Sequence, residues 1–221
     1  MSLGVRLAQA VEARISPFGF RYSRKTHALL RATPHGFEQL LWTSYPTETS
    51  GHSGQRYSLV AGVRHDSVED AVNRLGLVYG AENQRATTTV SCVLEYFPIV
   101  PGKSYSLFIQ NNASDAEVYA AAAEISQILR DELIPFFERY AELLRCADDL
   151  SEDPMAVSHH LFNNYENRMY RAIAASCISG RSTFSEQMEY WQSVYESVLP
   201  KTIHAKVAGR LGALAGSICG S

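Results

Sequence analysis

The chain has 221 residues, 46% of them hydrophobic and 19% charged, with a formal net charge of −3. This is enough apolar material for a sizeable core and excludes wholesale disorder. A protein whose whole surface binds nucleic acid would be basic, so the charge argues against that class. The four cysteines are far apart, with no Cys-x-x-Cys and no Cys/His cluster at metal-ligand spacing, so neither a metal nor a cofactor is expected.

The first residues lack the apolar run of a signal peptide, and no stretch of about 18 apolar residues exists to cross a membrane. A cytoplasmic location is therefore expected. The first element is an amphipathic helix over residues 3–15, because its apolar residues recur at intervals of four, at Leu3, Leu7, Val11 and Ile15. Pro17-Phe-Gly19 ends it.

Strand patterns then continue to about residue 110. FRYSRKTHALLRA and FEQLLWTSY flank the turn residues Thr33-Pro-His-Gly36, which predicts a hairpin. The pattern RYSLVAGV at 56–63 alternates, with Tyr57, Leu59, Ala61 and Val63 on one face. Two further strands are expected at 87–97 and 105–109, joined across residues 98–102.

Two connections between these strands can be interpreted locally. SVEDAVNRL predicts a short helix with Ser67 as its N-cap. Residues 51–55, Gly-His-Ser-Gly-Gln, lack the glycine two positions after the serine that a nucleophile elbow requires. This segment is therefore expected to be a flexible loop.

After residue 112 the pattern becomes helical. Ser114-Asp-Ala-Glu117 is a capping box that opens a long helix, and Pro135 within it predicts a kink or a brief break. The polar segment 147–154 is interpreted as a linker. Three more helical patterns follow, marked by apolar residues around Met169, Trp191 and Leu211.

The last of these patterns carries small residues, which allow close helix packing; they are Ala205, Ala208, Gly209, Gly212, Ala213 and Gly216. Either this face packs against its own domain or it docks another chain.

Strands in a run followed by helices in a run indicate an α+β fold. We expect an N-terminal helix, a mostly antiparallel sheet of about five strands, and a helical C-terminal half packed on the sheet. The expected division is an α+β sheet domain with its long closing helix at 1–146 and a helical segment at 154–221. That segment either closes the sheet's core or forms a separate lobe.

Charge is unevenly distributed along the chain. Residues 1–35 hold six Lys or Arg against one acidic residue, a net charge of +5, whereas residues 115–153 hold eleven acidic residues against three Arg, a net charge of −8. The two regions either neutralise each other within the molecule or present opposite charges to partners.

The basic residues of 17–42 are interleaved with aromatic ones, which makes Arg21, Arg24, Lys25 and Trp42 the first candidate binding residues. An ordinary strand with a charged outer face explains the same pattern, with Tyr22 and Arg24 on one side and Lys25 on the other. A second candidate face is a polar ridge at intervals of four, formed by His160, Asn164 and Arg168.

No catalytic, metal or phosphate-loop motif is present, which favours a non-catalytic protein. The first hypothesis is a protein-interaction domain, immunity- or scaffold-like, whose expected partner is another protein and not a membrane. The alternative is an enzyme acting on nucleic acid, with chemistry from His27, His35, His65 and Asp66. A third is a small-ligand pocket roofed by Tyr165, Tyr190 and Trp191. No oligomeric state can be derived.

Several stretches together resemble a bacterial family of α+β domains of unknown function; they are Phe18-Gly19-Phe20-Arg21, Leu29-Leu30-Arg31, RYSLVAGV and Ile134-Pro-Phe-Phe-Glu-Arg139. The resemblance covers residues 1–145 at most. The chain departs from the family in its long connection SYPTETSGHSGQ and in the helices after residue 154. Some members are suspected immunity-type or partner-binding proteins, so the resemblance implies that role, and it assigns no functional residue.

Overall fold

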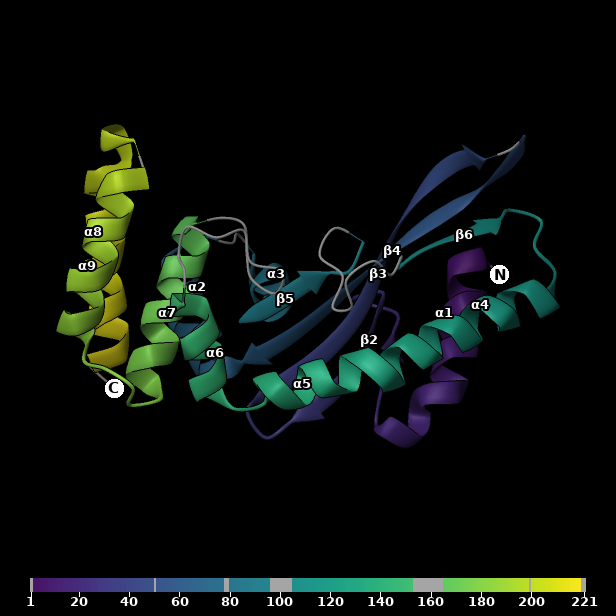
Figure 1. Cartoon of the computed structure of the whole chain (residues 1–221), viewed down its shortest axis with the longest axis horizontal. Coiled ribbons are helices and arrows are strands. Elements are labelled where there is room, and N and C mark those ends of the chain that lie inside the picture. Colours follow the sequence, from purple (N-terminus) through teal and green to yellow (C-terminus); the bar gives the residue numbers. More distant parts are fainter. Residues whose placement is uncertain are drawn as a thin grey trace. The chain divides into compact units, whose positions relative to one another are not determined.

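The computed structural model describes residues 2–49, 51–77, 80–95, 105–152, 165–198 and 200–219. It confirms the α+β class, with an N-terminal helix, a mostly antiparallel sheet and a helical C-terminal half (Figure 1). The chain divides into two compact units. Unit 1 is Met1–Val63 with Ser91–Glu138, and unit 2 is Arg64–Val90 with Arg139–Ser221. Both units are discontinuous in sequence, whereas the division expected from sequence was drawn between residues 146 and 154.

The sheet contains six described strands in the order β1-β2-β3-β4-β5, with β6 also paired to β4. Their bounds are β1 Arg21–Ser23, β2 Ala28–Thr33, β3 Gly36–Thr49, β4 His52–His65, β5 Val90–Val93 and β6 Ser106–Gln110. The predicted hairpin is confirmed, since β2 and β3 are antiparallel and Thr33 pairs with Gly36.

A second, unpredicted hairpin precedes it. The sequence pattern placed Arg24 and Lys25 on one strand with Tyr22, but β1 ends at Ser23 and residues 24–27 form the turn into β2. His27 completes this turn with a positive φ of 51°. Side chains alternate between two faces in a strand and not in a turn. The expectation that Arg24 and Lys25 point to opposite faces of a strand is therefore wrong.

Residues 52–55 belong to β4, so the flexible loop expected at 51–55 is wrong over most of its length. Gly54 lies in this strand opposite Gln110 of β6. A Cβ at Gly54 would lie 2.5 Å from both the Ile109 carbonyl oxygen and the Phe108 ring. Glycine is required here because the two strands approach closely. In a strand, glycine marks such a close approach and not a loop.

The expected inward face of β4 is confirmed, because Tyr57, Leu59, Ala61 and Val63 are all buried. The strands predicted at 87–97 and 105–109 form as β5 and β6, although the described part of β5 is shorter than predicted. β6 pairs with residues 54–58 of β4. The predicted connection across residues 98–102 lies outside the described residues.

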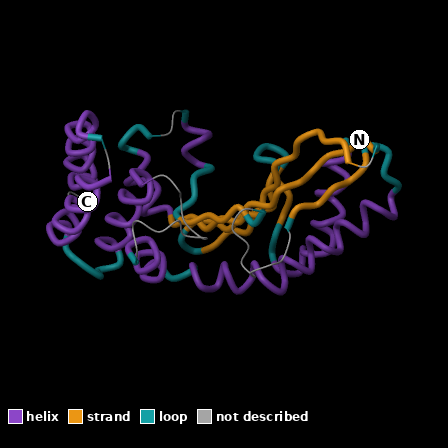
Figure 2. The backbone as a smooth tube through the Cα atoms, turned by 45° about the horizontal axis from the view of Figure 1, so that its top comes forward, coloured by secondary structure: helices purple, strands orange, loops and turns teal. Residues whose placement is uncertain are grey.

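Unit 1 adds helices to the sheet: α1 Leu3–Ile15, followed by the 3-10 turn Ser16–Phe18, α4 Asp115–Ile128, the π-helical turn Leu129–Leu133, and α5 Ile134–Tyr140, which belongs to unit 1 as far as Glu138. α1 and α4 pack on each other and lie on one side of the sheet (Figures 1 and 2). The capping box of Ser114 and Glu117 is confirmed at the start of α4.

The break predicted at Pro135 is also confirmed. The helix changes to π geometry at Leu129–Leu133, directly before Pro135, and returns to α geometry in α5. Proline has no N–H to donate, and a π turn is a usual place for a helix to change its hydrogen-bond register. The apolar stripe continues through the break with Leu133, Phe136 and Phe137 buried.

Unit 2 contains the remaining helices: α2 Asp66–Asn73, α3 Ala81–Arg85, α6 Leu143–Ser151, α7 Tyr165–Ile178, α8 Phe184–Val198 and α9 Lys201–Cys219. α7 packs against α2, α6, α8 and α9, which makes it the centre of the unit. α2 begins two residues earlier than predicted, with His65 and not Ser67 at the N-cap. α3 was not predicted.

The linker expected at 147–154 is wrong as far as residue 151, because α6 runs through it with Ala147 and Leu150 buried. Four acidic residues after Ala147 give the segment its linker-like composition. Asp148 and Asp149 belong to α6, where Asp149 is 15% exposed and pairs with Arg139. The remainder of the expected linker, after residue 152, lies outside the described residues.

α9 buries Val207, Leu211 and Leu214, whereas its small residues face outward. Gly209, Gly212 and Gly216 have no atom within 4 Å of where a Cβ would be. Close packing of the small face against the chain's own domain is therefore not observed. No helix in the described part of the chain is both long and apolar enough to span a membrane.

Candidate functional site

The structure brings three of the predicted binding residues together at the β1–β2 turn. Arg24 and Lys25 lie in the turn and are exposed, and the register Ala28–Leu41 places Trp42 at the same end of β2. Trp42 is half-buried. Arg21 is exposed in β1, and its guanidinium donates to the carbonyl oxygens of Ser16 and Phe20, at 3.1 and 2.9 Å. We call Arg21, Arg24, Lys25 and Trp42 the β1–β2 turn surface.

Some of the basic residues of the first 35 are neutralised within unit 1. Arg6 pairs with Asp115 at the start of the acidic helix α4, and Arg31 pairs with the buried Glu38. The Arg31 guanidinium also lies 4.9 Å from the centre of the Phe20 ring, which stacks near Phe137. Neutralisation by the acidic region 115–153, one of the two alternatives raised by the charge pattern, therefore holds for Arg6, whereas Arg31 is neutralised within its own hairpin.

Arg24 differs from them, because its side chain has no hydrogen bond or ion pair to any described residue. The sole acidic residue of 1–35 is Glu12, whose carboxylate accepts the backbone N–H of Tyr22 at 3.1 Å. The positive charge of Arg24 is therefore exposed without a neighbouring carboxylate from its own segment.

The second predicted binding face does not form as expected. Arg168 is buried in α7, where its Nε donates to the carbonyl oxygen of Leu150 at 2.9 Å. Its guanidinium joins α7 to the end of α6 and is not available on a surface ridge. His160 and Asn164 lie outside the described residues.

The histidines proposed for chemistry on nucleic acid have other roles. His65 is buried, with Nε2 2.8 Å from the carbonyl oxygen of Tyr140, and Asp66 pairs with Arg64. His27 and His35 are exposed in turns, and Nδ1 of His27 lies 3.3 Å from the Tyr22 hydroxyl. The described residues contain no group of three His, Cys, Asp or Glu side chains placed to hold a metal ion.

The buried thiols are poor nucleophiles. Burial raises the pKa of Cys92 and of Cys146 to about 12, which keeps both as neutral thiols near pH 7. Burial also raises the pKa of Tyr140, whose hydroxyl donates to Asp149 at 2.7 Å. These groups are structural.

The third predicted site, a pocket under aromatic residues of the C-terminal helices, has a different geometry. Trp191 is buried, and Tyr190 packs edge-on against it and donates its hydroxyl to the Ser151 carbonyl at 2.9 Å. Both side chains therefore tie α8 to the unit. The side chain of Tyr165 is outside the described part.

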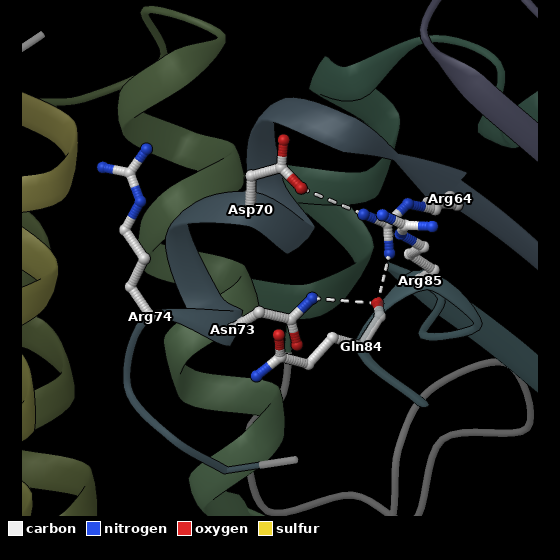
Figure 3. Close-up of a pocket in the computed structure, with 6 residues that line it drawn as sticks. All are labelled: Arg64, Asp70, Asn73, Arg74, Gln84 and Arg85. Carbon is white, nitrogen blue, oxygen red and sulfur yellow. Dashed lines mark hydrogen bonds and ion pairs between the residues drawn. The ribbon is translucent and has the colours of Figure 1, made fainter. Parts of the chain in front are cut away.

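Unit 2 has a polar pocket that the sequence did not suggest. It has a volume of about 520 Å³ and is lined by α2, α3 and the last part of β4, through Arg64, Asp70, Asn73, Arg74, Gln84 and Arg85 (Figure 3). Three of the six lining side chains are arginines and one is acidic. The lining therefore has an excess of positive charge, although the whole chain is acidic.

Arg64 is the organising residue of this pocket. It is buried, and its Nε pairs with Asp66 at 2.5 Å while a terminal nitrogen pairs with Asp70 at 3.1 Å. The other terminal nitrogen donates to the carbonyl oxygens of Gln84 and Thr87 and to the Thr87 hydroxyl. All its nitrogen atoms are therefore used to hold β4, α2 and α3 together.

Asn73 extends the same network but leaves one atom unused. Its Nδ2 donates to the Gln84 carbonyl at 3.0 Å and to the Thr87 hydroxyl at 3.2 Å, which fixes the amide orientation. Its Oδ1 is buried and has no hydrogen-bond partner. Arg74 and Arg85 are exposed and make no hydrogen bond or ion pair with the described residues.

A second hollow, of about 290 Å³, lies between α1 and α4 in unit 1. Its arginine, Arg6, is already committed to Asp115 and to the Ala113 carbonyl. The two charged side chains that line this hollow, Arg6 and Asp115, are therefore paired with each other, whereas the pocket of unit 2 has two uncommitted arginines.

Sequence reasoning missed the pocket of unit 2 because its residues come from separate elements. Arg64 ends a strand, Arg74 follows α2, and Arg85 ends a helix that was not predicted. The available signal was the density of charged residues between 64 and 85, but their spacing matches no motif.

Comparison of the chain with family models, curated proteins and solved structures gives no match. The resemblance to a bacterial α+β family, and the immunity-like role it implies, stays a hypothesis.

Proposed function

We propose that this protein is a non-catalytic interaction domain that binds an acidic protein partner through the β1–β2 turn surface. The observation that carries the proposal is the exposed guanidinium of Arg24, which has no acidic partner in the described chain and belongs to the turn at the same end of β2 as Trp42. Two other arginines of the same basic segment, Arg6 and Arg31, are by contrast neutralised by Asp115 and Glu38.

The composition of the surface suits protein recognition. Arginine and tryptophan are the residues that most often dominate the binding energy of protein interfaces. A half-buried Trp42 supplies apolar contact area with little loss of side-chain freedom, and the neighbouring Arg24 and Lys25 supply the charge that orients an acidic partner.

An acidic protein suits this surface better than nucleic acid. Binding to a duplex usually requires many phosphate contacts, of the order of six to ten, because phosphate neutralisation supplies most of the affinity. The turn surface contains three cations on a chain with a net charge of −3. The experiment must therefore distinguish binding of nucleic acid from binding of an acidic protein.

The test is fluorescence anisotropy with labelled poly-L-glutamate and with DNA and RNA oligonucleotides of similar length. We expect the wild-type chain to bind poly-L-glutamate most tightly, with an affinity that falls as salt shortens the Debye length from about 10 Å at 0.1 M to about 3 Å at 1 M. Arg24→Glu combined with Lys25→Glu should weaken this binding at least about tenfold, a difference of about 1.4 kcal/mol.

The matched control is Lys201→Glu combined with Lys206→Glu, which makes the same change in net charge at two exposed positions of α9. This control variant should bind poly-L-glutamate within about twofold of wild type, because exposed charges outside the binding surface contribute little. Tighter binding of either oligonucleotide would establish the nucleic-acid alternative, and equal loss in both double variants would show that only net charge matters. Either result overturns the proposal.

A further inference from the structure

The pocket lined by α2 and α3 has features of a ligand site. We propose that it binds a small organophosphate that carries hydroxyl groups, in the class of sugar phosphates and nucleoside monophosphates. The site lies in unit 2 and uses none of the residues of the β1–β2 turn surface, so it goes beyond the proposed function and is independent of it.

The size of the pocket indicates an organic ligand. Its volume of about 520 Å³ lies within the range of roughly 300–1,000 Å³ that is usual for small-molecule sites. A bare phosphate ion would leave most of this space to water. The lining is also mainly polar, since all six side chains carry hydrogen-bonding groups.

The anion-binding groups are Arg74 and Arg85. The guanidinium of Arg64 is neutralised by Asp66 and Asp70 and saturated by carbonyl oxygens, so it positions Asp70 and does not need a ligand. Arg74 and Arg85 have no such partners. Figure 3 shows Arg74 on one side of Asp70 and Arg85 on the other side, next to Arg64. The Arg74 and Arg85 side chains are both exposed, and they would have to turn toward each other to hold one phosphate dianion, which arginine binds with paired N–H donors.

The hydroxyl-binding groups are Asn73 and Asp70. The Asn73 Oδ1 is a buried acceptor without a donor, and such groups are uncommon because burial removes water without replacing its hydrogen bond. The amide cannot turn to relieve this, because Nδ2 is held by Gln84 and Thr87. A ligand hydroxyl would donate to Oδ1, while the outer oxygen of Asp70 would accept a second hydroxyl. The hydrogen phosphate dianion has a single O–H donor, which is too few for both acceptors.

A structural role for Arg74 and Arg85 must be distinguished from their proposed role in ligand binding. Arg74 is the C-cap residue of α2 and Arg85 lies in the last turn of α3, where any cation interacts favourably with the helix dipole. That role predicts a small loss of stability on substitution and no ligand affinity. It also gives no account of the unpaired oxygen of Asn73.

Isothermal titration calorimetry on the full chain tests the proposal, with ribose 5-phosphate and adenosine monophosphate as probes. Ribose, adenosine and inorganic phosphate are the matched comparisons, because each lacks one half of the proposed ligand. We expect both organophosphates to bind, ribose and adenosine to give no signal, and inorganic phosphate to bind at least about tenfold more weakly.

Arg85→Gln and Arg74→Gln should each weaken ribose 5-phosphate at least about tenfold, since each removes one charged phosphate contact. Arg14→Gln is the matched control, because it makes the same substitution at an exposed arginine of unit 1 that belongs to neither proposed surface, and it should leave the affinity unchanged. The unfolding midpoint of each variant shows that the pocket is still folded.

Absence of binding by both organophosphates overturns the proposal, as does equal affinity for inorganic phosphate, which would show a bare anion site. Equal affinity of the wild type and the two pocket variants would place the ligand elsewhere and also overturns it. None of these results affects the proposed function, whose test depends on Arg24 and Lys25.

Discussion

The two units bury charge in opposite ways. None of the described arginines of unit 1 is buried, and its interior is formed by the inward face of β4 and the stripe of α4 and α5. Unit 2 buries three arginines, Arg64, Arg168 and Arg171, inside its helical core. The charged side chains that unit 1 buries are therefore carboxylates, Glu38 and Glu132, whereas the elements of unit 2 are joined by buried guanidinium groups.

The geometry of Arg171 shows how such burial is tolerated. Nε and a terminal nitrogen donate to the two carboxylate oxygens of Glu69, both at 2.8 Å, and Nε also donates to the Thr88 carbonyl at 3.0 Å. Glu69 is fully buried in α2. Burying an ion pair is favourable only when both charges are fully hydrogen-bonded, so this contact fixes α2 against α7 more than it adds stability.

The largest expected effect breaks that pair. Arg171→Met leaves the Glu69 carboxylate buried without a partner, and we expect unit 2 to lose about 3–5 kcal/mol in its free energy of unfolding. Urea unfolding followed by native-state hydrogen exchange measures the loss in each unit. Adding Glu69→Leu should restore most of the stability, because two apolar side chains need no partner.

The control for this experiment is Arg6→Met in unit 1. Arg6 pairs with Asp115, whose side chain is 81% exposed, so its loss should cost about 1 kcal/mol or less. If Arg171→Met costs no more than Arg6→Met, the contrast between the two units is wrong.

A smaller effect concerns alkaline pH and affects both units. The thiol of Cys146 in unit 2 and that of Cys92 in unit 1 are both held neutral, with the pKa of each raised from 9.0 to about 12 by burial. Between these values the unfolded chain releases the proton and the folded chain keeps it. The stabilisation is therefore complete below about pH 9 and is lost as pH rises toward about 12, at up to about 1.4 kcal/mol per pH unit for each thiol.

Cys146→Ala and Cys92→Ala should each make the fall of stability above pH 9 less steep, which urea unfolding at increasing pH measures. The wild-type slope should also be steeper in unit 2, because burial raises the pKa of both Tyr140 and Tyr170 there. If the slope of stability against pH is unchanged in either alanine variant, the thiol that it replaces is ionised to the same extent in the folded and the unfolded chain.

The smallest expected effect is the loss of stability when a helix N-cap is removed, and it should be equal in the two units. Ser114 and Glu117 form a capping box before α4, and Thr183 and Glu186 form the same arrangement before α8. Ser114→Ala and Thr183→Ala should each cost about 1 kcal/mol, because each leaves one helical N–H without its acceptor. Chemical denaturation of the two variants compares them, and a difference of more than about 1 kcal/mol would show that the caps depend on their units.

Prediction from sequence is correct where it depends on apolar faces and caps, and it is wrong at particular places in both units; in unit 1 these are the turn at 24–27 and the strand at 52–55. In unit 1 the inward face of β4, the hairpin at Thr33–Gly36, the capping box at Ser114 and the break before Pro135 were all derived correctly. In unit 2 the acidic segment after Ala147 begins as part of α6 and not as a linker, and Arg168 is buried and not on an outer ridge. Periodicity identifies apolar faces, and it cannot identify a charged residue that is buried with its partner.

The sequence by itself determined the class of the fold, the positions of most strands and helices, and the basic character of the β1–β2 turn, because each of these depends on residues that are close together in the chain. Only the tertiary structure decided which charges are neutralised, since Glu69 meets Arg171 across 102 positions and Arg6 meets Asp115 across 109. It also decided where the pocket of unit 2 lies. Electrostatic pairing depends on distance in space, and a linear sequence does not contain that distance.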